Sequence, residues 1–148
     1  MPVHQAIADV KTICQQRGLR LTPIRQQVLE LILAADGPVK AYDLLERLTS
    51  ASKDQRRSAP PTVYRALDFL LENHFIHRLE TMNAFVSCVH PEKSHSGEFL
   101  ICEQCDMVIE LSTKILSNEV REAAEAHQFQ AHKQVVEVYG TCRTCQQA

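Results

Sequence analysis

Two C-x-x-C pairs constrain the fold of this chain more than any other feature of its sequence. Cys102 and Cys105 form the first pair, and Cys142 and Cys145 form the second. Zinc favours four tetrahedral thiolates, and two turns that each present two thiolates satisfy that geometry. Each pair follows a strand-like run, so the two strand ends can meet at one edge of a sheet. We therefore interpret the four cysteines as a structural zinc site that braces a domain with a small core of its own.

Two other interpretations of these thiols remain open. The four cysteines could be unliganded, either buried or reactive. A redox C-x-x-C should open a helix, where the helix N-terminus lowers the thiol pKa, whereas here a strand-like run follows. The N-terminus, "MPVHQAIADVK", lacks the apolar segment of a signal peptide, so we expect the chain to stay in the cytoplasm. Six cysteines in a cytoplasmic protein favour thiols or metal ligands over disulfides.

Charge divides along the chain in the same way as the cysteines. Residues 1–81 carry eleven Lys/Arg against nine Asp/Glu, whereas residues 82–148 carry five against nine. The first part is therefore slightly basic and the second acidic, although the net charge of the whole chain is −2. Five of the six cysteines also lie after residue 81. This division predicts two modules.

The first module reads as helices followed by a hairpin. Apolar residues recur at helical spacing in 4–17, 23–35, 41–51 and 60–74, and Thr22 and Pro23 are typical of a helix start. The first of these helices carries Cys14, which we interpret as a buried thiol. Two strand-like runs, 75–80 and 83–88, then form a hairpin by length and composition. Helices followed directly by a hairpin are the order of a winged helix-turn-helix.

The second module reads as a small α/β unit. Strands are expected at 98–102, 107–111 and 133–140, with one helix that begins at a cap on Ser112. The predicted fold class is α+β, with a winged-helix domain at 1–88, a polar linker at 89–97 and the small α/β domain at 98–148.

The helix at 60–74 presents a polar face opposite its apolar stripe. Thr62, Tyr64 and Arg65 lie near its N-terminus, where an Arg can pair with a guanine edge and the helix end attracts phosphate. Further cations could supply nonspecific phosphate contacts: Arg20, Arg25, Lys53, Arg56 and Arg57. We interpret this helix as a DNA-reading helix, although Tyr64 and Arg65 could instead solvate an amphipathic helix.

A second set of metal-capable residues lies between 77 and 110. His77, Cys88, His95 and Glu110 supply two imidazoles, a thiolate and a carboxylate, which suit four-coordinate zinc. These ligands come from the hairpin, the linker and the second module, so an ion bound there would fix how the modules are oriented. Each residue also has an ordinary interpretation, as surface or core. His90 lies close enough to Cys88 to compete with His95 as a ligand.

Four motifs, "RLTPIR", "AYDLLERL", "PPTVYRALDFLLE" and "FLICEQCDMVIEL…CRTC", resemble the ferric uptake regulator superfamily, and the third resembles its zinc uptake regulator branch. The resemblance implies a homodimeric repressor with a C-terminal dimerisation domain, for which zinc is the corepressor at operators of zinc-uptake genes. It implies two zinc ions per monomer, one structural at the four paired cysteines and one regulatory. The regulatory ligands it implies are His77, Cys88, His95 and Glu110, and its DNA-contacting positions match Tyr42, Tyr64 and Arg65.

Several other functions compete with a zinc sensor. Iron-, manganese- and peroxide-sensing relatives use oxygen and nitrogen ligands, which disfavours them here because Cys88 is a thiolate. A zinc deaminase is suggested superficially by "HPE" before "CEQC", but Ile101 stands where that motif has proline. A zinc-braced adaptor that binds protein would leave Tyr64 and Arg65 without a role. We therefore expect no enzymatic activity, no small-molecule substrate and no membrane partner.

Overall fold

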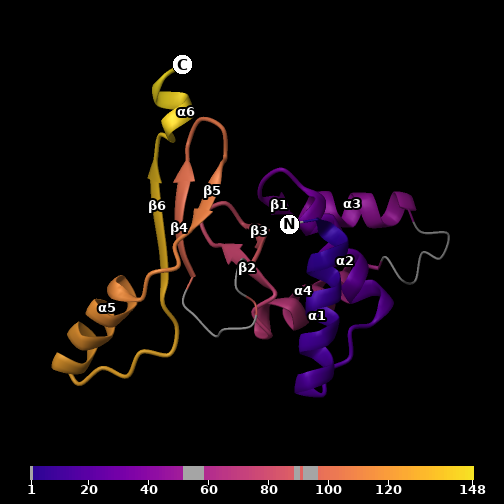
Figure 1. Cartoon of the computed structure of the whole chain (residues 1–148), viewed down its shortest axis with the longest axis horizontal. Helices are drawn as coiled ribbons and strands as arrows, with labels where there is room; N and C mark the ends of the chain where they lie inside the picture. The colour runs from indigo at the N-terminus through magenta and orange to yellow at the C-terminus, as the bar shows by residue number, and fades with distance from the viewer. Residues whose placement is uncertain (1, 52–58, 89–90, 92–96) are drawn as a thin grey trace. The chain divides into compact units, whose positions relative to one another are not determined.

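The computed structural model describes residues 2–51, 59–88, 91 and 97–148, which belong to two compact units, 1–94 and 95–148 (Figure 1). The division between the units falls inside the stretch assigned above to the linker. The domain boundaries drawn from the sequence stay a prediction.

The first unit contains four helices and a small antiparallel sheet among its described residues. In chain order its elements are α1 (Val3–Arg17), α2 (Pro23–Ala34), β1 (Val39–Lys40), α3 (Ala41–Ala51), α4 (Pro60–Glu72), β2 (Ile76–Leu79) and β3 (Ala84–Ser87). The sheet order is β1-β3-β2, with His77 opposite Val86 in the hairpin. The two-residue strand β1 was not expected, because so short a segment shows no alternation. The order of elements confirms the predicted winged helix.

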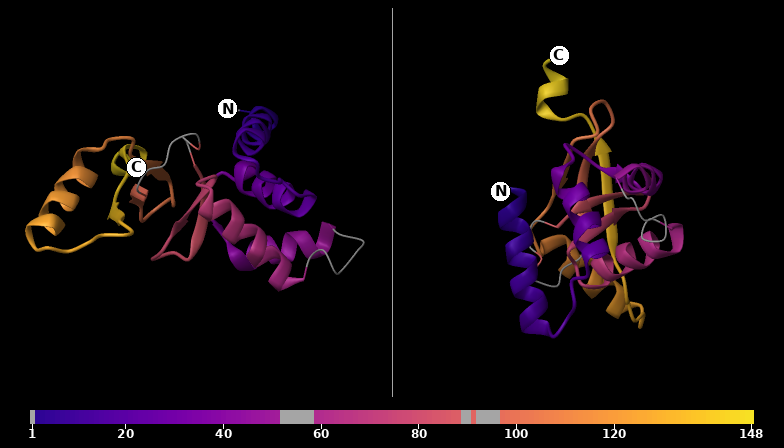
Figure 2. Two further views of the ribbon diagram at one scale, coloured as in Figure 1. Left: turned by 90° about the horizontal axis from the view of Figure 1, so that it is seen from below. Right: turned by 90° about the vertical axis from the view of Figure 1, so that its right-hand side faces the viewer.

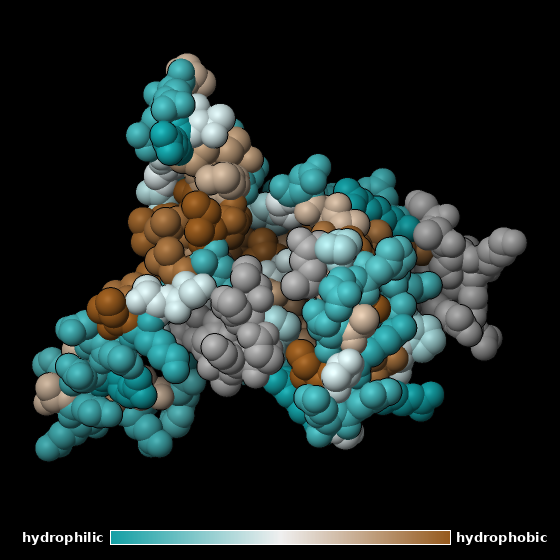
Figure 3. Space-filling view, in the orientation of Figure 1, coloured by the Kyte–Doolittle hydropathy of each residue, from teal (hydrophilic) through white to brown (hydrophobic). Residues whose placement is uncertain are grey.

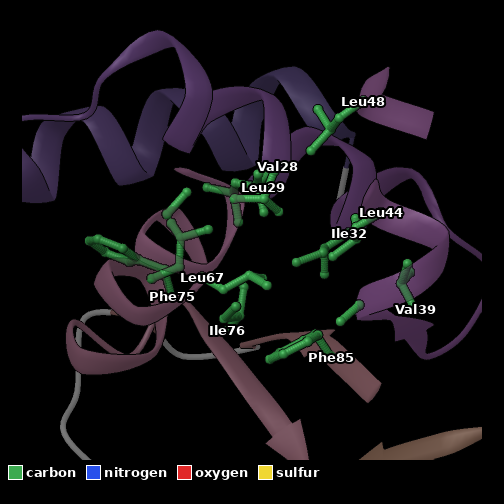
Figure 4. Packing of buried hydrophobic residues seen from close by; sticks show 14 of the residues in the cluster. Val28, Leu29, Ile32, Val39, Leu44, Leu48, Leu67, Phe75, Ile76 and Phe85 are labelled. Carbon is green, nitrogen blue, oxygen red and sulfur yellow. The ribbon is translucent and has the colours of Figure 1, made fainter. Parts of the chain in front are cut away.

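Apolar side chains from all four of these helices and from the small sheet make the core of this unit (Figure 4). Val28 and Leu67 are buried at the α2–α4 contact, and Ile76 and Phe85 cover them from the sheet. Cys14 is 2% exposed, and burial raises its pKa, as expected for a core thiol. The helical spacing of these residues therefore orients α4 so that its polar face is left outside.

The second unit is a three-stranded sheet with a crossover helix. Its elements are β4 (Gly97–Cys102), β5 (Val108–Glu110), α5 (Ile115–Ala126), β6 (Val135–Gly140) and α6 (Arg143–Gln146). The sheet order is β5-β4-β6; β4 pairs antiparallel with β5 and parallel with β6. The parallel pairing requires a crossover connection, which α5 supplies. These elements confirm the predicted α+β fold class.

The start of α5 differs from the prediction. Ser112 was expected to cap this helix, but the N-cap position is Lys114, and Thr113 Oγ1 accepts the Ile115 N–H at 3.2 Å. Two hydroxyl residues stand side by side here, and the sequence pattern could not distinguish them. Among the described helices, none is both long and apolar enough to cross a membrane.

Candidate metal centre and nucleic-acid interface

The turn between β4 and β5 presents the first pair of cysteines. Cys102 ends β4, and its N–H donates to the Met107 carbonyl at 2.9 Å, which closes the turn. Asp106 adopts a φ of 59° within this turn, a conformation that Asp tolerates better than most residues. The turn and α6 lie at the same end of the sheet in Figure 1 and in the right-hand view of Figure 2.

The second pair reaches the first because β6 runs beside β4. The Glu103 N–H donates to the Gly140 carbonyl at 2.9 Å, and the Cys142 N–H donates to Cys102 Sγ at 3.3 Å. The four sulfur atoms lie within 4.8 Å of one another, and Cys105 Sγ and Cys142 Sγ are 3.7 Å apart. A tight turn and the first residues of the short helix α6 therefore bring four sulfur atoms to distances that fit a tetrahedral thiolate centre.

The four thiols differ in their affinity for protons. The Cys142 N–H, and then the Cys105 and Gln104 N–H groups, lower the pKa of Cys102 to about 6. Hydrogen bonds that the protonated Cys145 thiol donates to the sulfurs of Cys142 and Cys105, together with burial, raise the pKa of Cys145 to about 12. At neutral pH the site therefore contains a thiolate already formed by backbone donors.

The hairpin of the first unit brings His77 and Cys88 together. The Cys88 N–H donates to the Phe75 carbonyl at 3.1 Å, so Cys88 is diagonal to His77 on one face of the β2–β3 ladder. His77 is 8% exposed and Cys88 is half-buried. A ring nitrogen of His77 and the sulfur of Cys88 lie within 4.8 Å of each other. These two groups can share one metal ion.

The other two ligands predicted for the regulatory site follow the hairpin in the sequence. His95 and its competitor His90 are outside the described residues. Glu110 is half-buried at the end of β5 in the second unit, opposite Phe99 of β4. The complete four-ligand set stays a prediction.

The polar face of α4 has the exposure that a DNA-reading helix needs. Tyr64 is 48% exposed and Arg65 is exposed beside it, while Thr62 is half-buried in the first turn. Tyr42, in the first turn of α3, is 74% exposed. Both tyrosine side chains are therefore accessible to a partner molecule.

The cations predicted to contact phosphate differ in their environments. Arg20 is exposed. Arg25 is half-buried: its guanidinium lies 3.8 Å from the Phe69 ring centroid, and its Nη1 donates to the Arg20 carbonyl at 2.6 Å. Arg25 therefore packs α2 against α4, a role that sequence reasoning missed, although one guanidinium can do this and still face a phosphate. Lys53, Arg56 and Arg57 lie outside the described residues.

An apolar row crosses the exposed face of the second sheet. Leu100 of β4 pairs with Ile109 of β5 and with Val138 of β6, and the three side chains are 37%, 46% and 48% exposed. Figure 3 shows apolar side chains gathered over this sheet. Helix α5 adds Ile115, Leu116 and Val120, none of them buried. Together they form an apolar surface that fits a partner protein.

One polar residue of this sheet was not singled out from the sequence. Glu98 of β4 is only 1% exposed, and the Ser117 hydroxyl of α5 donates to its Oε1. Its other oxygen, Oε2, has no hydrogen-bond partner among the described residues. The available signal was a carboxylate inside the otherwise apolar run "EFLIC", which strand alternation alone assigns to the surface.

These observations define a class of protein: a winged-helix protein whose second unit contains a cluster of four cysteines that could hold a metal ion. The chain belongs to the Ferric uptake regulator family, whose sequence profile matches residues 16–139. The zinc uptake regulation protein of Escherichia coli K12 is 38% identical to it over 143 residues, covering 96% of this chain and 82% of that protein.

Two solved structures are similar over nearly the whole length. Holo XcZur shares 48% identity at a TM-score of 0.88, with 96% of this chain and 97% of that chain covered. A zinc uptake regulator complexed with zinc and DNA shares 36% identity at a TM-score of 0.91, with 99% and 97% covered.

Proposed function

We propose that this protein is a zinc-responsive transcriptional repressor that acts as a homodimer in the cytoplasm. Loaded with zinc it binds operator DNA of zinc-uptake genes, and without the regulatory zinc it releases that DNA. The observation that carries the proposal is the presence of both a four-cysteine cluster in the second unit and a His77–Cys88 pair in the first, in a chain related to zinc uptake regulators over nearly its full length.

The two sites would have different tasks. Cys102, Cys105, Cys142 and Cys145 would hold a structural zinc that ties β6 to the β4–β5 turn. His77 and Cys88, with His95 and Glu110, would hold the regulatory zinc. An imidazole next to a thiolate favours zinc over iron or manganese, which supports zinc as the sensed metal. We assign no catalytic residue.

DNA recognition would use the polar face of α4. Arg65 and Tyr64 would contact base edges in the major groove, with Thr62 and Tyr42 at the adjacent backbone. Arg20, Arg25 and Arg57 would contact phosphates. The exposed apolar row of the second sheet would be covered by a second copy of the chain, because a palindromic operator requires a two-fold symmetric protein.

The test measures duplex affinity for a palindromic operator while zinc is titrated against a chelator, with zinc per monomer measured in parallel. We expect two zinc ions per monomer, with the weaker ion alone controlling DNA affinity. Cys88→Ser should remove the zinc response and leave the fold intact. Cys14→Ala, which removes a thiol from the core of the first unit, is the matched control and should respond normally.

Two outcomes would contradict the proposal. DNA affinity that does not change with zinc would exclude a zinc sensor. Unfolding of the Cys88→Ser variant would place Cys88 in the core rather than in a regulatory site.

A further inference from the structure

Arg17, the last residue of α1, contacts two distant parts of the first unit at once. Its Nη1 donates to the Asn73 carbonyl and its Nη2 donates to the Pro91 carbonyl, each at 3.2 Å. Its guanidinium carbon also lies 5.9 Å from the centroid of the Phe75 ring. One side chain therefore connects the end of α1, the end of α4 and the segment that follows β3.

Asn73, which Arg17 contacts, lies at the C-terminal end of the proposed DNA-reading helix α4. Asn73 is the C-cap of α4, and its side-chain amide donates back to the Phe69 carbonyl at 2.8 Å. The last carbonyls of a helix carry partial negative charge, so a guanidinium there is favourable. Arg17 thus fixes the C-terminal end of the same helix whose N-terminal turn carries Tyr64 and Arg65.

Pro91, the other residue that Arg17 contacts, lies close to Cys88, a proposed ligand of the regulatory zinc. Pro91 follows Cys88 by three residues. The Cys88 N–H donates to the backbone carbonyl of Phe75, and the ring of the same residue lies under the Arg17 guanidinium. Between α1 and this segment lies a cleft of about 360 Å³, lined from α1 by Asp9 and Ile13 and from the far side by Cys88 and Pro91. Because close packing is interrupted there, polar contacts such as that of Arg17 contribute more to the position of Pro91.

We propose that Arg17 is a positioning residue that couples the regulatory zinc to the DNA-reading helix. This inference rests on the proposed function. An ion held by Cys88 fixes the segment that carries Pro91, and the guanidinium transmits that position to the Asn73 end of α4. A coupling of this kind is a free energy between two sites, so zinc strengthens DNA binding by the factor by which DNA strengthens zinc binding.

The test uses the full-length protein and compares two dissociation constants for the operator: fully zinc-loaded, and after chelation of the weaker zinc alone. Their ratio measures the coupling. Arg17→Gln should reduce this ratio about fivefold or more, since even modest coupling energies have effects of that size. Lys11→Gln removes the same charge from the exposed surface of the same helix, and should keep the ratio within about twofold.

Arg17→Lys tests whether coupling requires both hydrogen bonds of the guanidinium. It also replaces Arg17→Gln in the test if that variant folds poorly. A single ammonium cannot reproduce the planar fork that reaches both carbonyls, so we expect a reduced ratio here too. A lost phosphate contact would instead weaken both states alike and lower the salt dependence of binding.

The outcomes separate this inference from the function on which it rests. A wild-type ratio near one would overturn both. A large wild-type ratio that stays unchanged in Arg17→Gln, or in Arg17→Lys, would overturn the bridging role of Arg17 and leave the zinc sensor standing.

Discussion

At the scale of single residues, the four paired cysteines are chemically unequal although they belong to one cluster. Backbone N–H groups stabilise the thiolate of Cys102, whereas Cys145 lies among neighbouring thiols that favour its protonated form. The difference follows from position. Cys102 ends a strand and lies near the backbone N–H groups of Cys142, Cys105 and Gln104, whereas Cys145 lies inside a short helix. We therefore expect Cys102 to be the first of the four cysteines to bind an incoming metal ion.

This inequality predicts how zinc affinity depends on pH. With a pKa of about 12, Cys145 must lose a proton to bind zinc at any pH from about 5 to 8. The affinity of the structural site should therefore fall by at least about tenfold per pH unit on acidification. Below about pH 6, Cys102 must also lose a proton to bind zinc. The zinc affinity should then fall by roughly a further factor of ten for each pH unit.

Competition with a chelator of known affinity, followed across this range, checks the prediction. Proton release measured by calorimetry in buffers of different ionisation enthalpy is the control. An affinity independent of pH would mean that the thiolates are formed before zinc arrives.

At the scale of secondary-structure elements, α5 makes a polar contact with the sheet that it crosses. None of its residues is buried, yet Ser117 donates to the buried carboxylate of Glu98 on β4. Burial of a carboxyl group costs free energy, which a hydrogen bond to one of its oxygens partly offsets. The contact therefore fixes where the helix crosses the sheet.

Removing this hydroxyl should destabilise the second unit. Ser117→Ala leaves Glu98 Oε1 without its donor, and we expect the free energy of unfolding to fall by about 1–3 kcal/mol. Denaturant unfolding of the zinc-loaded protein measures the change. Ser112→Ala, an exposed serine shortly before the helix, should stay within about 0.5 kcal/mol. Equal stability of the two variants would show that Glu98 finds another donor.

The individual elements show how much of the structure could be predicted from the sequence. Apolar periodicity predicted α1 to α4, because one helix face is buried and the period is visible. The C-x-x-C spacing predicted the sulfur cluster. By contrast, burial of Glu98 depends on where α5 crosses the sheet, and stacking of Arg25 on Phe69 depends on how α2 meets α4. Such contacts arise from tertiary packing, which no local pattern records.

At the scale of the whole molecule, the second sheet exposes an apolar row that a folded monomer leaves in water. Leu100 lies at its centre, between Ile109 and Val138. Covering this row removes apolar area from solvent and favours association. In the proposed repressor, association also sets the spacing of two DNA-reading helices.

A charge in this row should separate the subunits. Val138→Glu would place an unpaired carboxylate in the interface, and we expect the dimer dissociation constant to rise roughly a hundredfold or more. Sedimentation equilibrium measures it, and operator affinity should fall in parallel while the structural zinc is retained. Gln130→Glu adds the same charge in an exposed loop, and should leave the dimer intact. A dimeric Val138→Glu protein would place the interface elsewhere.

The parallel pairing of β4 with β6 also has a consequence for the order of folding. The β4–β5 hairpin closes a short loop, whereas Cys142 must find Cys102 across forty positions of the chain. Contacts distant in sequence form late, so the hairpin and its two thiols should be in place before β6 arrives. Zinc would first bind a half-built site and then hold the late strand. Stripping this ion should therefore release β6 first, and hydrogen exchange should report the loss there before it reaches the hairpin.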